Sequence, residues 1–162
     1  MIRRILVVFF AAVVLTAGTG CGIDYDLRKV DDVLVKALNN KYPSASRVEW
    51  ERNGSYYVAE FYDNGTDLKV WFKKGGEWCM TEWDMGRNLS EVPASIVDAI
   101  KAGKYASWEI DDIDRYEKPD EVFYVFTIET PGLRDRVLFF SEAGILLKDE
   151  VERGDITPKT KI

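Results

Sequence analysis

The stretch SYYVAEFYDNGTDLKVWFKKGGEW, residues 55–78, decides the fold class of this chain. Ser55–Tyr62 is rich in Tyr, Val and Phe, which favour β-strands. In Leu68–Lys73, Leu68, Val70 and Phe72 alternate with Lys69, Trp71 and Lys73, which is the period of a half-buried β-strand. The two runs are joined by Asp63-Asn64-Gly65-Thr66, and Gly75-Gly76 follows the second run. Both of these are hairpin-turn sequences. The stretch therefore predicts consecutive antiparallel strands.

The residues on either side of this stretch complete a first half. Apolar residues recur at helical spacing from Leu27 to Leu38, and Asn39-Asn40 is expected to end that helix. Val48–Trp50 alternates ahead of an Asn53-Gly54 turn, and Trp78–Trp83 follows the Gly-Gly turn. The first half is expected to be a helix followed by a four-stranded antiparallel meander.

The second half repeats this order of elements. Pro93 suits the first turn of a helix that continues to Gly103. A shift of 67 residues superimposes Tyr57-Val58 on Tyr124-Val125, which favours an internal duplication. We therefore expect an α+β fold built as a tandem duplication, with each half a helix packed on a four-stranded antiparallel sheet. The second set of strands is expected at residues 108–113, 122–130, 136–140 and 145–151.

The N-terminus has the pattern of an export signal. Arg3-Arg4 precedes the apolar run Ile5–Leu15 and a group of small residues, so residues 1–20 are predicted to be a signal peptide. Cys21 resembles a bacterial lipidation site, which would make residues 21–25 a linker to a lipid anchor. Such sites usually carry Leu where Gly18 stands, so ordinary cleavage that leaves a thiol stays open. The expected location is the periplasm or the outer membrane, with lipid as the only membrane contact.

Composition excludes several classes of function. The chain contains no histidine, which removes Ser-His-Asp and Cys-His catalysis and zinc sites ligated by histidine. Cleavage after residue 20 would remove two of the 22 basic residues and none of the 28 acidic ones, leaving a formal charge of −8. Such a surface repels nucleic acid. Only Cys79 would then accompany Cys21, and residues 153–162 are expected to form a flexible tail.

One sheet face is predicted to be open and rich in aromatic residues. Alternation places the polar residues Glu60 and Thr127 on this face together with Tyr56, Tyr62 and Phe123, and helices would cover only the other side of each sheet. Such a composition is typical of a protein interface. Two alternatives stay open: the halves curl together and bury the face, or the assignment slips by one residue. The predicted partner-binding residues are Tyr56, Tyr62, Lys69, Trp71, Lys73, Phe123, Arg136 and Phe140.

Several core and turn motifs are shared with a known family. They include Lys41-Tyr42-Pro43, Val48–Trp50, Tyr57–Phe61, Val70-Trp71-Phe72 and Gly75–Trp78, followed by Val92-Pro93, Tyr124, Phe126 and Phe139. With these motifs the chain resembles the PepSY-like family of secreted bacterial proteins, also described as β-lactamase-inhibitor-like. The resemblance implies two subdomains, residues 26–86 and 87–152, folded like the β-lactamase inhibitor protein. It implies no enzymatic activity and no cofactor.

Two functions remain open on the sequence alone. The first is a non-catalytic envelope module that holds or restrains a protein partner through its open sheet face. The second is a sensor of a small ligand or of calcium that uses the carboxylates of Asp111–Asp114, although the spacing of a calcium loop is missing. A solvated acidic edge explains that cluster more simply. We expect no catalytic residues, no metal site and no cofactor.

Overall fold

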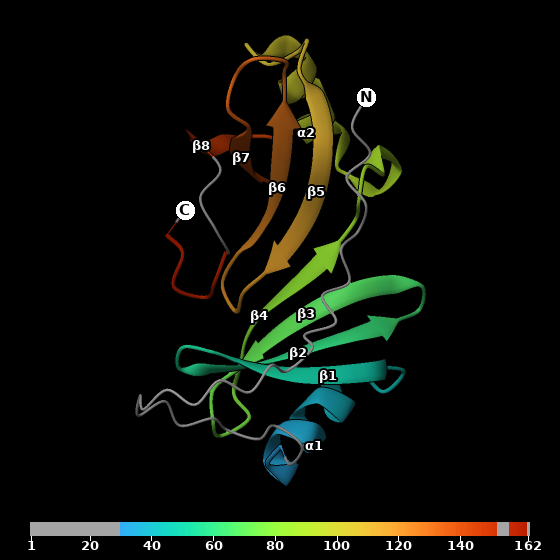
Figure 1. The fold of residues 1–162 in the computed structure, drawn as a ribbon. Coiled ribbons are helices and arrows are strands. Elements are labelled where there is room, and N and C mark those ends of the chain that lie inside the picture. Colours follow the sequence, from blue (N-terminus) through green and yellow to red (C-terminus); the bar gives the residue numbers. More distant parts are fainter. Residues whose placement is uncertain (1–29, 152–155, 162) are drawn as a thin grey trace, which may run out of the picture.

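The computed structural model describes residues 30–151 and 156–161, and its centre is one antiparallel sheet of eight strands in the order β1 to β8. Two α-helices accompany the sheet, each ahead of four strands (Figure 1). The bounds are α1 Asp32–Lys41, β1 Ser46–Asn53, β2 Tyr56–Asp63, β3 Thr66–Phe72, β4 Trp78–Asp84, the short 3₁₀-helix η1 Leu89–Glu91, α2 Ala94–Ala102, β5 Glu109–Glu117, β6 Val122–Glu129, β7 Arg136–Ser141 and β8 Leu146–Val151.

The hairpins form where their turn residues predict them. Asn64 and Gly65 take φ values of 49° and 97°, the left-handed pair that a two-residue hairpin needs between β2 and β3. Several boundaries differ from the prediction, among them those of α1 and β5. Helix α1 continues through Asn39-Asn40 to Lys41, and β5 extends to Glu117, four residues beyond the expected 113.

Both helices pack on the same side of the sheet. Leu34 and Leu38 of α1 are buried against a cluster from β2 and β3 that includes Phe61 and Val70. Ile96 of α2 is buried against the corresponding cluster of the second half, which includes Phe126, Leu138 and Phe140. The apolar stripe of each helix therefore meets one face of its own four strands.

The opposite face of the sheet, here called the inner face, carries no helix and is nevertheless largely buried. Its apolar cluster joins Val58, Trp71 and Met80 of the first half to residues of the second half. The second half contributes Tyr116, Phe123, Val125, Val137 and Phe139. The rings of Tyr116 and Phe123 stack at 5.1 Å. The alternative in which the halves curl together is therefore confirmed.

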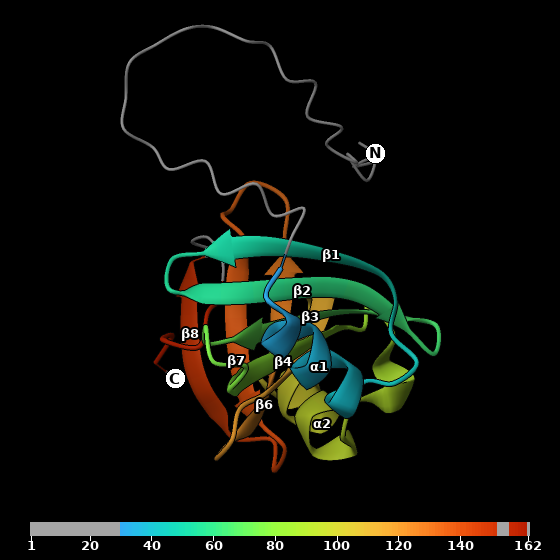
Figure 2. The ribbon, with the colours of Figure 1, turned by 90° about the horizontal axis from the view of Figure 1, so that it is seen from below.

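The two sets of four strands form one sheet rather than two. Strand β4 pairs with β5 from Thr81↔Glu117 to Asp84↔Asp114. The first strands run across the direction of the later ones (Figure 1 and Figure 2). Residues of both edge strands, β1 and β8, line a common cavity. The sheet thus curls toward its inner face. The order of helix and four strands is confirmed in both halves, whereas the internal duplication stays a prediction.

The C-terminal residues 156–161 lie against the protein, in contrast to the flexible tail expected there. Ile156 packs on the inner-face cluster, and Lys118 Nζ donates a hydrogen bond of 3.0 Å to the Thr160 carbonyl. Lys159 lies 5.8 Å from the centre of the Tyr56 ring. These contacts tie the tail to both halves of the sheet.

Candidate functional site: an acidic cavity on the inner face

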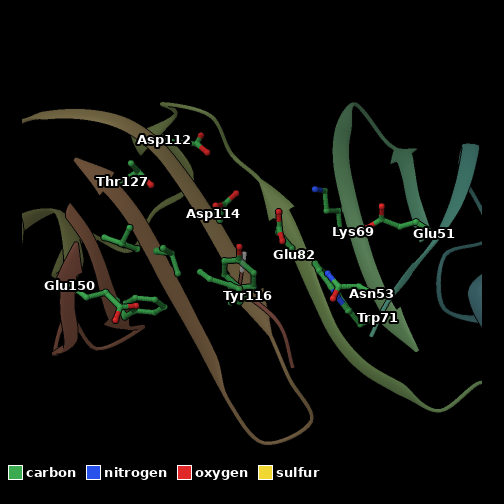
Figure 3. Close-up of a pocket in the computed structure, with 14 residues that line it drawn as sticks. Glu51, Asn53, Lys69, Trp71, Glu82, Asp112, Asp114, Tyr116, Thr127 and Glu150 are labelled. Carbon is green, nitrogen blue, oxygen red and sulfur yellow. The ribbon is translucent and has the colours of Figure 1, made fainter. Parts of the chain in front are cut away.

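A cavity of about 240 Å³ opens on the inner face where the two halves meet. Six of its residues carry most of its chemistry, and Figure 3 shows them together: Lys69, Trp71, Glu82, Asp112, Asp114 and Tyr116. Val125, Val137 and Phe139 form an apolar part of the wall. The cavity is therefore apolar on one side and acidic on the other.

Strand pairing brings the polar residues together. Lys69 on β3 lies opposite Glu82 on β4, and Glu82 lies opposite Tyr116 on β5. Directly paired residues of an antiparallel sheet have Cβ atoms about 4.5–5.5 Å apart and share a face. Asp114 is two residues from Tyr116 on β5 and so shares that face, diagonal to Glu82. The cluster thus comes from three adjacent strands.

The carboxylates of this cluster are crowded and poorly hydrated. Burial raises the pKa of Glu82 to about 7, although nearby Lys69 opposes the shift. Burial also raises the pKa of Asp114 to about 8, and the charges of Glu82 and Asp112 add to the effect. Burial and the same carboxylates raise the pKa of Tyr116. The site is therefore short of positive charge.

Lys69 is the cation within the cluster, and it is shared. Its ammonium lies 3.2 Å from a carboxylate oxygen of Glu60 on β2. Burial lowers the pKa of Lys69, but Glu82 and Glu60 together outweigh this and raise it. The Lys69 ammonium therefore interacts with Glu60 on one side and with Glu82 on the other. A second cavity of about 250 Å³ adjoins the first, and Lys69, Glu82, Asp112 and Asp114 line both.

The carboxylates of residues 111–114 do not converge. Asp112 and Asp114 line the cavity, whereas Asp111 pairs with Arg87, whose Nη1 also lies 3.2 Å from Glu109. Across residues 30–151 and 156–161, no three His, Cys, Asp or Glu side chains are grouped so that they could hold a metal ion. This arrangement weakens the calcium alternative.

The comparisons with known proteins agree with this architecture. The family described as "Putative beta-lactamase-inhibitor-like, PepSY-like" matches residues 55–148. The chain belongs to this family. Solved structures of similar proteins support the assignment, and the PepSY-like resemblance seen in the sequence is confirmed. Among curated proteins, none matches the chain.

Three solved structures from Bacteroides illustrate the similarity. A BLIP-like protein from Bacteroides fragilis shares 32% identity with a TM-score of 0.72, over 80% of this chain and 92% of that one. A protein from Bacteroides eggerthii described as periplasmic shares 27% identity with a TM-score of 0.71, over 76% of this chain and 89% of that one. A DUF2874 family protein from Bacteroides ovatus shares 30% identity with a TM-score of 0.69, over 73% of this chain and 84% of that one.

The periplasmic description of the B. eggerthii protein supports export of this PepSY-like protein. The predicted signal peptide, residues 1–20, and Cys21 lie outside the described residues, as does the linker to residue 25. None of the helices that the structure describes has the length and apolar character needed to span a bilayer.

The open aromatic face predicted from the sequence is not present in this PepSY-like fold. Trp71 and Phe123 do lie on the inner face, but only 3% and 1% of their surfaces are exposed because the sheet curls over them. Tyr56 packs against the same cluster at its margin. Lys69 lies on the inner face within the acidic cluster. Burial of Trp71 and Phe123 thus corrects the expectation of exposed aromatic residues.

The predicted faces of the side chains of β7 are wrong. Phe139 pairs with Val125 and therefore lies on the inner face, which turns Phe140 toward α2. Phe140 is 3% exposed there, and Arg136 shares that side with a short ion pair to Asp149. A one-residue slip of register moves every side chain of a strand to the other face. Phe140 and Arg136 are therefore not part of the inner face.

The remaining two predicted residues lie at strand ends. Tyr62, near the end of β2, is 39% exposed, and exposed Lys73 follows β3 and pairs with Glu77 at 2.7 Å. Neither lines the inner-face cavity. A binding role for the eight predicted residues stays a prediction, but the structure does not bring them to one surface.

Sequence reasoning missed the acidic cluster. The sequence predicts a solvated edge for Asp112 and Asp114, and no motif indicates a role for Glu82. The structure corrects this, because β5 pairs with β4 and β6 and is therefore internal. Alternation does place Asp112, Asp114 and Tyr116 on one face of β5. Only the pairing of β4 with β5, across 24 residues that include α2, adds Glu82 to them.

Proposed function

We propose that this protein is a non-catalytic binding module of the cell envelope that holds a protein partner on its inner face through a positively charged segment. One observation carries the proposal: Glu82, Asp112 and Asp114 share a cavity in which Lys69 is already paired with Glu60. A ligand that brings positive charge would stabilise the ionised carboxylates.

The energetics favour a cation over a neutral or acidic ligand. Glu82 and Asp114 have raised pKa values because burial removes water from their charged forms. An incoming guanidinium or ammonium replaces that water with charge-assisted hydrogen bonds, which are stronger than neutral ones. Two further carboxylates line the cavity wall, Glu51 on β1 and Glu150 on β8, the latter paired with Lys148 at 3.1 Å. Electrostatic complementarity would also speed association.

The family description supports binding rather than catalysis, since it names an inhibitor-like fold and not an enzyme. Export by the predicted signal peptide would deliver the module to the periplasm, and acylation of Cys21 would tether it to a membrane. A duplication that produced residues 26–86 and 87–152 fits the shared order of helix and four strands. These three points are part of the proposal.

Crosslinking in the native envelope tests the proposal. Tagged wild-type protein is compared with the double variant Glu82→Gln/Asp114→Asn, which keeps the shape of both side chains and removes their charge. The matched control is Asp98→Asn/Asp120→Asn, which removes two exposed carboxylates, one on α2 and one in the β5–β6 turn.

We expect one protein to crosslink to the wild type and the control through a Lys- or Arg-rich peptide. Loss of both carboxylates should reduce its recovery by about tenfold or more, as expected for charged hydrogen bonds. Equal recovery with all three proteins would contradict the proposal, and so would crosslinks that map only to acidic or apolar segments.

A further inference from the structure

The side chain of Trp71 has an unused hydrogen-bond donor. Only 3% of its surface is exposed, and its indole Nε1–H is buried without an acceptor among the described residues. The great majority of buried side-chain donors in proteins have a partner, because an unpaired one loses its hydrogen bond to water. The donor therefore needs an explanation that the fold alone does not supply.

Trp71 lines the acidic cavity, so a ligand in that cavity could supply the missing acceptor (Figure 3). It lies two residues after Lys69 on β3 and pairs with Met80, which is two residues before Glu82 on β4. The donor and the carboxylates thus share one inner face and are separated along the strands by about one pleat repeat. A ligand that satisfies both would carry an acceptor oxygen and a cationic group on a short linker.

The size of the cavity limits which kind of ligand it can hold. The cavity that Trp71 lines has about 240 Å³, below the range of about 300–1,000 Å³ that is typical for drug-sized ligands and cofactors, and the adjoining cavity of about 250 Å³ is not lined by Trp71. One long side chain with its peptide group is of suitable size. The apolar wall of Val125, Val137 and Phe139 suits the methylene stem of Lys or Arg, whose charged end then reaches the carboxylates.

We propose that the cavity anchors one Arg or Lys side chain of an extended peptide segment, with its charged group at Glu82 and Asp114 and a peptide carbonyl accepting a hydrogen bond from Trp71 Nε1–H. This inference rests on the proposed function and specifies which part of the partner is recognised. The carbonyl distinguishes a peptide from a simple amine, which would satisfy the carboxylates and leave Trp71 unpaired.

The test observes Trp71 directly. Protein purified as the cell exports it is labelled with ¹⁵N, and the indole N–H signals of its tryptophans are followed by NMR during titration. The probe is the peptide acetyl-Gly-Arg-Gly-amide. Two matched probes accompany it: the citrulline peptide, which lacks the charge, and butylguanidine, which has the guanidinium but no carbonyl. The variant Trp71→Phe assigns the signal, and contacts to the Met80 methyl group assign it should that variant not fold.

We expect the arginine peptide to move the Trp71 signal downfield and to leave the other indole signals in place. The citrulline peptide and the Glu82→Gln/Asp114→Asn variant should each weaken binding by about tenfold or more, the size expected for one lost charged hydrogen bond. Butylguanidine loses the neutral bond to Trp71 and should bind about threefold or more weakly than the arginine peptide. The Asp98→Asn/Asp120→Asn control should bind like the wild type.

A Trp71 signal that stays in place at saturating peptide would overturn the inference, and so would equal binding of the citrulline peptide. Equal binding of butylguanidine would show a guanidinium site without peptide recognition, which also overturns it. The two proposals fail separately. Capture of a basic partner in the envelope with an unmoved Trp71 signal refutes only the anchor, whereas a shifted signal without any captured partner refutes only the envelope function.

Discussion

Replacing Asp114 with Asn should remove much of the pH dependence of this protein's stability between about pH 4 and 8. The chain has no histidine, and Glu82, with a pKa of about 7, is another carboxylate of the cavity that titrates within this interval. Burial raises the pKa of Asp114 from 3.8 to about 8 in the folded protein. The groups that face it are Glu82 and Asp84 on β4, Asp112 on β5 and Lys69 on β3.

The sign of the effect follows from which state holds the proton. Below pH 3.8 both the folded and the unfolded chain carry a proton on Asp114, and its contribution to stability is fully present. As the pH rises, the unfolded chain ionises first, and each further unit lowers the free energy of unfolding by about 1.4 kcal/mol. The loss ends near the folded pKa of about 8.

The magnitude follows from the same values. A shift from 3.8 to about 8 corresponds to about 6 kcal/mol if the site is rigid and dry. The carboxylate opens onto a cavity that water can enter, so we expect roughly half of this, ~3 kcal/mol. Asp114→Asn should therefore be more stable than the wild type by ~3 kcal/mol at about pH 9, and nearly equal to it at about pH 4.

Urea unfolding of the exported protein at a series of pH values measures this difference. The control is Asp98→Asn on α2, an exposed carboxylate on the other side of the sheet, which should leave the pH profile unchanged. A wild-type profile that is flat over the interval would refute the reasoning. An Asp114→Asn profile that falls as steeply as the wild type would refute it equally, since another group would then be responsible.

Two further changes test the packing around the sheet. Thr81→Val should lower the free energy of unfolding by ~2 kcal/mol or more. The buried Thr81 Oγ1 forms hydrogen bonds with Tyr42 Oη at 2.8 Å and with Trp78 Nε1 at 2.9 Å, and valine would leave both groups without a partner there. Chemical unfolding measures the change, and an unchanged midpoint would contradict the prediction. Gly144→Ala should lower the free energy of unfolding by ~2 kcal/mol or more beyond the effect of Gly132→Ala. Both glycines have left-handed φ values, +80° at Gly144 and +82° at Gly132, but a Cβ at 144 would lie 2.5 Å from a backbone carbonyl oxygen of α2, whereas a Cβ at 132 would meet open space. Equal thermal midpoints for the two variants would contradict this prediction.

Most of the secondary structure could be predicted because its signals are local. The turn at Asn64-Gly65 and the alternation in Leu68–Lys73 specify a hairpin without reference to the rest of the chain. The face of β7 could not be predicted in this way. Its residues 137–140 are all apolar, Val-Leu-Phe-Phe, because both sides of that strand are buried. Such a run carries no alternation from which a face could be assigned.

The acidic cluster of the cavity could not be predicted from the sequence for a different reason. Asp114 looked like a solvated residue because acidic side chains are seldom buried, and no nearby residue in the sequence suggested otherwise. Its burial arises from the curl of the sheet, which is a property of all eight strands together. Alternation groups Asp112 with Asp114, but the sequence does not show which side of the sheet they face or which strands lie beside β5.

The distribution of polar residues on the inner face itself favours a binding role. The apolar cluster around Trp71, Tyr116 and Phe123 already holds the two halves together, so stability would be served by extending it. Instead Glu82 and Asp114 lie beside it, at a cost in folding free energy that grows with pH. Replacing such groups with apolar residues of similar volume is often neutral or stabilising. Their presence at the one junction where the halves meet is explained if a cation carried by a partner occupies that place.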